Sequence, residues 1–172
     1  MAPPRIRPMR QDDWSSFDIL DQETFPGDRV TRNYFDLYLA SNGFYALESD
    51  TGDLLGYVKI TDLKDGTGFL SRIAVTQALQ QQGLGSNLVE FCLRWFRERN
   101  VRQIDLNTQD FNVSAQRLYQ KFGFIRVGTM WHYIVSFKVL QPESPRYKIQ
   151  ILKPEEIGLI SQLFPKTMGI SR

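Results

Sequence analysis

A short polar loop with two glycines, residues 80–86, constrains this chain most, because it stands between a predicted strand and a predicted amphipathic helix. The strand ends in Ile73-Ala74-Val75, and the loop reads Gln80-Gln81-Gln82-Gly83-Leu84-Gly85-Ser86. The helix is predicted over 86–99 from a broad apolar stripe at helical spacing. The N–H groups of its first turn lack partners within the helix, and the helix dipole adds positive potential there. Because glycines let a ligand approach the backbone closely, the loop predicts a cradle for a pyrophosphate.

The residues around these glycines exclude two familiar phosphate loops. No Gly-Lys-Ser/Thr follows them, as a Walker loop requires, and the third glycine of the dinucleotide-binding fingerprint is missing. The glycine pair alone is weak evidence, so its meaning depends on the rest of the chain.

Short β-type runs alternate with helical patterns over the first 140 or so residues. Strands are predicted at 6–9, 43–49, 54–63, 69–75, 104–108, 124–127 and 131–140. Helices are predicted at 12–24, after a Thr31 cap, at 86–99 and from Asn112 to the glycine at 123. This order is an antiparallel meander followed by a β-helix-β-helix-β unit. We therefore expect an α/β or α+β fold, with one sheet and helices on its faces.

The last part of the chain stands apart in sequence. Two prolines mark residues 142–145 as a linker, which divides the chain into a domain over 1–141 and an extension over 142–172. The extension repeats the layout of the N-terminus, with a strand, an acidic first helical turn and a Phe-Pro pair. It is either a terminal strand and helix packed on the first domain or the vestigial start of a second domain.

Composition narrows the class of protein. The 172 residues are 42% hydrophobic and 23% charged, with a net charge of +2, so neither disorder nor a nucleic-acid or membrane-surface partner is expected. The apolar runs are far too short for a membrane helix, and no secretory signal is visible. The single cysteine, Cys92, falls on the apolar helix stripe, which suits a core residue in a reducing cytoplasm and excludes a cysteine-built metal site. We expect a cytoplasmic protein without a metal.

A second patterned segment begins about thirty residues after the loop. It contains Asn112-Val113-Ser114-Ala115, then Leu118-Tyr119, then Gly123-Phe124. Asn112 suits a helix N-cap and Gly123 a helix C-terminus, with an apolar face between them.

The loop and this segment together resemble the GNAT acyltransferase (N-acetyltransferase) superfamily. Gln80, Gly83 and Gly85 match the signature Gln/Arg-x-x-Gly-x-Gly/Ala. Residues 112–124 match Asn-x-x-Ala-x-x-Leu-Tyr-x-x-x-Gly-Phe at every named position. The resemblance covers about residues 5–140 and extends more weakly to the protein amino-terminal acetyltransferases of this family.

The resemblance implies a mixed, mostly antiparallel sheet, split by a V-shaped CoA cleft between the strand ending at Val75 and the strand at 104–108. Helices would cover both faces. The cofactor-binding residues that it implies are Ile73, Ala74, Val75, Gln80, Gln81, Gln82, Gly83, Leu84, Gly85, Ser86, Asn112 and Tyr119. Asn112 would bond the pantetheine, cap its own helix, or do both. Arg117 and Lys121 would either meet the ribose phosphate or form a solvated helix face.

The activity implied is acetyl transfer from acetyl-CoA to a primary amine by direct attack in a ternary complex. The acceptor would be a small amine, an amino acid or a protein N-terminus. The Val75 N–H or a neighbouring one would stabilise the oxyanion, and Tyr119 would protonate the leaving thiolate. The alternative function is a non-catalytic acyl-CoA-binding or scaffold domain of the same fold. Either form is expected to be a monomer or a homodimer.

The general base is missing from its usual place. Amino-terminal acetyltransferases often carry Glu or His five residues before the motif Asn, and this chain has Asn107 there. The other candidates are a water chain or the side chains Glu23, Asp110 and Glu48. His132 is the only histidine, and a lone histidine on a strand is usually structural.

Acceptor specificity in this family comes from the first two helices, their loop and the last hairpin. The residues that would line an apolar-aromatic slot there are Phe25, Tyr34, Trp131 and Tyr133. Glu23 and Asp28 add negative charge that suits an amine.

Overall fold

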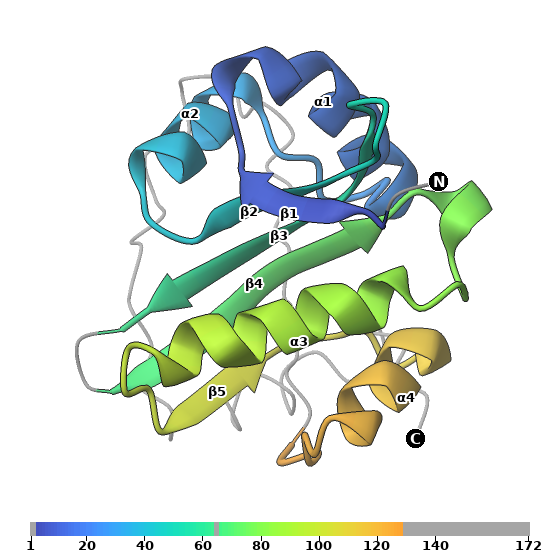
Figure 1. Ribbon diagram of the computed structural model, residues 1–172. Helices are drawn as coiled ribbons and strands as arrows, with labels where there is room; N and C mark the ends of the chain where they lie inside the picture. The colour runs from blue at the N-terminus through green and yellow to red at the C-terminus, as the bar shows by residue number, and fades with distance from the viewer. Residues whose placement is uncertain (1–2, 64–65, 129–172) are drawn as a thin grey trace, which may run out of the picture. The chain divides into compact units, whose positions relative to one another are not determined.

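One five-stranded sheet forms the frame of the fold, and its strand order follows the chain (Figure 1). This computed structural model describes residues 3–63 and 66–128. The strands are β1 (Arg5–Pro8), β2 (Phe44–Glu48), β3 (Leu54–Asp62), β4 (Thr67–Val75) and β5 (Gln103–Leu106). The first four strands pair antiparallel as a meander, and β5 runs parallel to β4. The mixed, mostly antiparallel sheet predicted from the sequence is confirmed.

Helices cover both faces of this sheet. They are α1 (Trp14–Thr24), α2 (Arg32–Ala40), α3 (Leu84–Arg97) and α4 (Val113–Lys121), with short 3-10 turns η1 (Gln11–Asp13) and η2 (Gln77–Leu79). Figure 1 shows α1 and α2 on one side of the sheet and α3 on the other, with α4 beside the first turns of α3. This confirms the predicted layers.

Strand alternation supplies a separate core on each face, because successive side chains of a strand point to opposite sides. Tyr57 and Ala74 pack with Phe17 of α1 on the first face. Val58 and Val75 pack with the α3 stripe, Cys92 included, on the second face. Cys92 is buried, as its place on the apolar stripe predicts.

The sheet splits where β4 bulges. Lys59 pairs with Arg72 and Ile60 with Leu70, so Ser71 is an extra residue in β4. Pairing between β4 and β5 ends with Leu70 opposite Leu106, whereas β4 continues to Val75. Bulges bend a strand and raise its twist, so β4 turns away from β5 at this point. We call the divergence of β4 and β5 beyond this last pair the split.

Local signals set the ends of the two helices that carry the motifs. Gly83, with φ at +87°, is the N-cap of α3, so the helix begins at Leu84, two residues earlier than predicted. Asn112 caps α4 as predicted, because its side-chain oxygen accepts a hydrogen bond from the Ala115 N–H at 3.1 Å. Gly123 has φ at +84°, a left-handed conformation that favours glycine, just after α4.

Two predicted strands differ from the structure. The predicted strand at 104–108 ends at Leu106, because its pairing with β4 stops at the split. The strand predicted at 124–127 is wrong, since no strand forms in this segment. A strand needs a hydrogen-bonded neighbour, and the predicted neighbour over 131–140 lies outside the described residues. The proposed boundary at 141/142, the 142–172 extension and the side chains of Trp131, His132 and Tyr133 lie outside them as well. Among the helices that the structure describes, none has the length and apolarity needed to cross a membrane.

Candidate active site

The edge of β4 beyond its last pair with β5 presents backbone groups to the split. Thr76 donates its N–H to the Leu55 carbonyl on β3 at 2.9 Å. In a strand, the backbone groups of successive residues point to opposite edges, so every second residue faces the same edge. The N–H groups of Ile73 and Val75 therefore face the split, whereas those of Ala74 face β3. Of the three residues predicted to pair with the pantetheine, Ile73 and Val75 offer the hydrogen-bonding groups.

The loop between β4 and α3, which the sequence predicts to be a pyrophosphate cradle, has a backbone that suits an anion. Gln81 and Gly83 both have left-handed backbones, with φ at 62° and 87°, and such turns gather N–H groups into an anion-binding concavity. Among the described residues, no partner is recorded for the N–H groups of residues 81–86. In the described part of the chain, nothing lies within 4 Å of a Cβ placed on Gly83, so the space above this glycine is open there. The loop can thus accept a phosphate at the positive end of α3.

Two motif positions, Gln80 and Gly85, have structural roles in this loop. The Gln80 amide nitrogen donates to the Val75 carbonyl at 3.1 Å, which ties the loop to the end of β4. A Cβ on Gly85 would lie 3.3 Å from the Leu118 side chain, so this glycine allows α4 to pack closely against α3. Gln80 therefore supports the cradle from beneath, and Gly85 joins the two helices that border it.

Tyr119 is buried on α4, with its ring centroid 5.8 Å from that of Phe124. Burial, with a smaller contribution from Cys92, raises the pKa of Tyr119 to about 12. Its hydroxyl has no hydrogen-bond partner among the described residues. Because this pKa lies far above neutral, the hydroxyl carries a proton at neutral pH that it can donate.

The structure is compatible with both roles predicted for each of Asn112, Arg117 and Lys121. The Asn112 side-chain oxygen is used by the N-cap, and its amide nitrogen has no recorded partner in the described part of the chain. Asn112 can therefore cap its helix and still donate to a ligand. Arg117 and Lys121 are exposed, which both interpretations of these residues allow.

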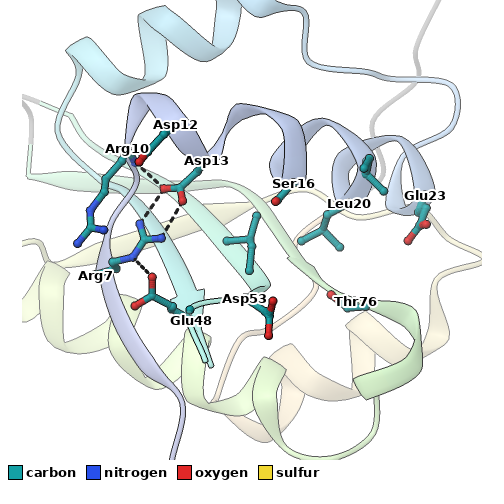
Figure 2. Close-up of a pocket in the computed structure, with 13 residues that line it drawn as sticks. Arg7, Arg10, Asp12, Asp13, Ser16, Leu20, Glu23, Glu48, Asp53 and Thr76 are labelled. Carbon is teal, nitrogen blue, oxygen red and sulfur yellow. Dashed lines mark hydrogen bonds and ion pairs between the residues drawn. The ribbon is translucent and has the colours of Figure 1, made fainter. Parts of the chain in front are cut away.

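The base candidates differ sharply in surroundings. Glu48 is buried and accepts hydrogen bonds from Arg7 and Arg5, each at 2.6 Å. These bonds, with Arg7 first, lower the pKa of Glu48, so this carboxylate holds β1 on β2 and is a poor proton acceptor. Figure 2 shows Arg7 between Glu48 and Asp13.

The remaining candidates are solvent-facing. Glu23 is exposed beside a cavity of about 540 Å³ that Glu48 also lines (Figure 2). Asp110 is exposed and lies 3.0 Å from Arg126. Asn107 is exposed just beyond β5.

A buried ion pair beneath the α1–α2 loop was not anticipated from the sequence. Asp21 on α1 is 0% exposed and accepts hydrogen bonds from Arg72 at 2.7 Å, from the Tyr57 hydroxyl and from the Val30 N–H at 2.8 Å. Arg72 stands 51 positions further along the chain, so no local spacing links it to Asp21. The only sequence signal was weak: Arg72 is a charged residue within a β-type run, and Asp21 follows two apolar residues of a helix.

The predicted acceptor residues that the structure describes lie around this pair. The Phe25 ring centroid is 4.0 Å from the Arg72 guanidinium carbon, and the Asp28 carboxylate is 2.9 Å from an Arg72 nitrogen. Tyr34, on α2, is 59% exposed. Phe25 and Asp28 are thus brought together by Arg72, whereas Tyr34 stands in solvent.

The two motifs predicted an acyltransferase with a split mixed sheet. The architecture and the loop agree with this class of protein. The model of the Acetyltransferase (GNAT) family matches residues 6–124, and the chain belongs to this family. In the part of the chain that the structure describes, no group of three or more His, Cys, Asp or Glu side chains is placed to hold a metal ion.

Known proteins similar to this chain include acetyltransferases. Streptothricin acetyltransferase A of Bacillus subtilis (strain 168) is 32% identical over 81 residues, which are 47% of this chain and 45% of that protein. The match thus spans about half the length of this relative.

Solved structures share the fold. The NatC complex bound to Gag peptide and CoA matches with a TM-score of 0.69 at 18% identity, covering 78% of this chain and 92% of the other. Ard1 from Thermoplasma volcanium matches with a TM-score of 0.67 at 21% identity, covering 72% of this chain and 84% of the other.

Proposed function

We propose that this chain is an acetyl-CoA-dependent N-acetyltransferase that acetylates a primary amine by direct attack in a ternary complex. The observation that carries the proposal is the split, where the Ile73 and Val75 amides face away from β3 beside an open loop of N–H groups at the start of α3. Membership of the GNAT family supports the same conclusion. A strand-like arm and a pyrophosphate, the two ends of the CoA tail, suit these two adjacent surfaces.

The chemistry of the residues at the split suits acetyl-CoA. The amides of residues 81–86 would hold the pyrophosphate, and the β4 edge at Ile73 and Val75 would pair with the pantetheine. The open space above Gly83 admits a phosphate where a side chain would intrude. When bound, acetyl-CoA supplies an acetyl group activated as a thioester.

The chain's own groups perform three tasks in this proposal. A backbone N–H at Val75 or Ile73 donates to a carbonyl oxygen in the split. Tyr119, which is protonated at neutral pH, donates a proton to the departing sulfur. Proton removal from the amine is assigned to a water chain or to one of the exposed carboxylates Glu23 and Asp110, because Asn107 cannot act as a base and Glu48 is held by two arginines.

The acceptor follows from the classes that similar proteins represent. One relative is a streptothricin acetyltransferase, and one structural neighbour holds a peptide with CoA. A small amine and a peptide N-terminus are therefore both candidate acceptors for this chain.

An assay of thiol release from acetyl-CoA over a panel of small amines, amino acids and peptides tests the proposal. Calorimetry with CoA is run in parallel on the same protein. We expect CoA binding together with turnover of at least one amine. Binding without turnover on any amine would favour the non-catalytic acyl-CoA-binding domain, and absence of binding would contradict both functions.

A further inference from the structure

We propose that Arg72 is a positioning residue for the acceptor and that Asp28, which it holds, selects an acceptor with a positive charge. This inference rests on the proposed acetyltransferase function. It concerns residues 25–30, which we call the acceptor loop, between α1 and α2. In the structure, Arg72 of β4 joins this loop through hydrogen bonds to Asp28 and a contact with the Phe25 ring.

The bulge at Ser71 aims Arg72 at the acceptor loop. Leu70 packs in the core beneath α3, and residues two apart in a regular strand share a face. The extra residue breaks this pattern, so Arg72 points to the opposite face, where α1 lies. The same bulge therefore separates β4 from β5 at the split and directs the Arg72 guanidinium toward the acceptor loop.

Arg72 contacts the acceptor loop at several points. Its nitrogens bond both the Asp28 carboxylate, at 2.9 Å, and the Asp28 carbonyl. The Phe25 ring lies against its guanidinium. Asp21, which pairs with Arg72, accepts the Val30 N–H at the far end of the loop. Arg72 is only 9% exposed, and these contacts fix the loop above the β4 segment that borders the split.

Asp28 is the outward-facing end of this network. Its side chain is 81% exposed, whereas the side chains of Arg72 and Asp21 are 9% and 0% exposed. Two carboxylates against one guanidinium leave a net charge of −1 in the cluster, as −2 + 1 gives. The negative end stands in solvent beside the split. An acceptor with a positive group near its amine would neutralise this net negative charge.

The same loop contains a matched control pair. Arg29 donates two hydrogen bonds to Asp18, at 3.0 and 2.9 Å, but its side chain is 52% exposed and it makes no recorded contact with β4. Arg29→Lys and Arg72→Lys keep the charge and remove the planar fork of donors. The two residues differ in their contacts: the Arg72 guanidinium holds the acceptor loop to β4, and the Arg29 guanidinium does not.

Steady-state kinetics on the full chain, with the panel amine that the wild type acetylates fastest, tests the positioning role. We expect Arg72→Lys to raise the KM of the amine about tenfold or more, since misplaced substrates lose rate steeply, with the dissociation constant of CoA within twofold. Arg29→Lys should change neither value. An unchanged amine KM in folded Arg72→Lys, or an equal loss in CoA affinity, would overturn the proposal.

Asp28→Asn tests the charge selection without touching the core. We expect it to raise the KM of an amine with a second positive charge by about two- to fivefold, the range of an exposed ion pair, and to leave a singly charged amine unchanged. Glu98→Gln, at the end of α3, removes an equally exposed charge and should have no effect. Equal effects of Asp28→Asn on both amines would refute the selection.

Hydrogen exchange at the Val30 amide separates this proposal from the proposed function. If the wild type acetylates no amine, the acetyltransferase proposal fails. Faster Val30 exchange in Arg72→Lys but not in Arg29→Lys would still support the positioning of the loop. Unchanged Val30 exchange in both variants would overturn it.

Discussion

Replacing Gly83 with aspartate separates the stability of α3 from its proposed role in CoA binding. Gly83 has φ at +87°, and a residue with a Cβ in this region costs about 1–2 kcal/mol. Aspartate tolerates the left-handed region better than most residues, and at an N-cap it is favoured over glycine by a few tenths of a kcal/mol. The net cost is therefore about 1 kcal/mol, and we expect the melting temperature of Gly83→Asp to fall by no more than about 4 °C.

The effect on CoA is expected to be large. No described atom lies within 4 Å of a Cβ at this position, so the new carboxylate extends into the open space of the cradle. There the carboxylate accepts hydrogen bonds from N–H groups in the first turn of α3 and repels a phosphate. Two unit charges 4 Å apart repel by about 1 kcal/mol in water and about 4 kcal/mol near a protein surface. A loss of about 2–3 kcal/mol raises the dissociation constant of CoA by about 30- to 150-fold.

Calorimetry with CoA and a thermal melt of the same samples check this prediction. Gly83→Asn is the control, because it has nearly the same shape without the charge and should lose less affinity than Gly83→Asp. A folded Gly83→Asp protein with wild-type CoA affinity would refute the assignment of the cradle.

Two further variants test the proposed proton donor Tyr119 and the buried carboxylate Glu48. Tyr119→Phe should slow acetyl transfer by at least about tenfold with CoA affinity within twofold, because it removes the proton donor alone, and wild-type turnover in a pH-dependent assay would exclude Tyr119. The lowered pKa of Glu48 predicts that its contribution to the free energy of unfolding is present above about pH 4.5 and is lost as the pH falls through the pKa of the folded state. Acid melts of Glu48→Gln should therefore show a lower stability at pH 7, by about 1–3 kcal/mol, and a weaker loss toward pH 3 than the wild type; parallel curves would contradict this account of Glu48.

The helices and their caps were predictable because their signals are local. Asn112 and Gly123 bound α4 where the sequence places them. Gly83 also marks the start of α3, although the helix begins directly after it and not at Ser86. Each of these positions depends on the conformation of one residue and its neighbours in sequence.

What the sequence did not predict depends on pairing between distant residues. The link from Asp21 to Arg72 joins α1 to β4, and the bulge that makes it possible appears only in the register of β3 against β4. The bond from Gln80 to the Val75 carbonyl depends in the same way on how the loop folds back. The error over 124–127 arose because a β-type run forms a strand only beside a partner.

Hydrogen exchange measured by NMR at single amides of β4, with and without CoA, tests the central claim that CoA binds in the split. Thr76 already donates its N–H to β3 and provides the internal reference. The account predicts that CoA slows exchange of the Ile73 and Val75 amides by about tenfold or more and leaves the Thr76 amide unchanged. Tight CoA binding with no added protection at Ile73 and Val75 would contradict it.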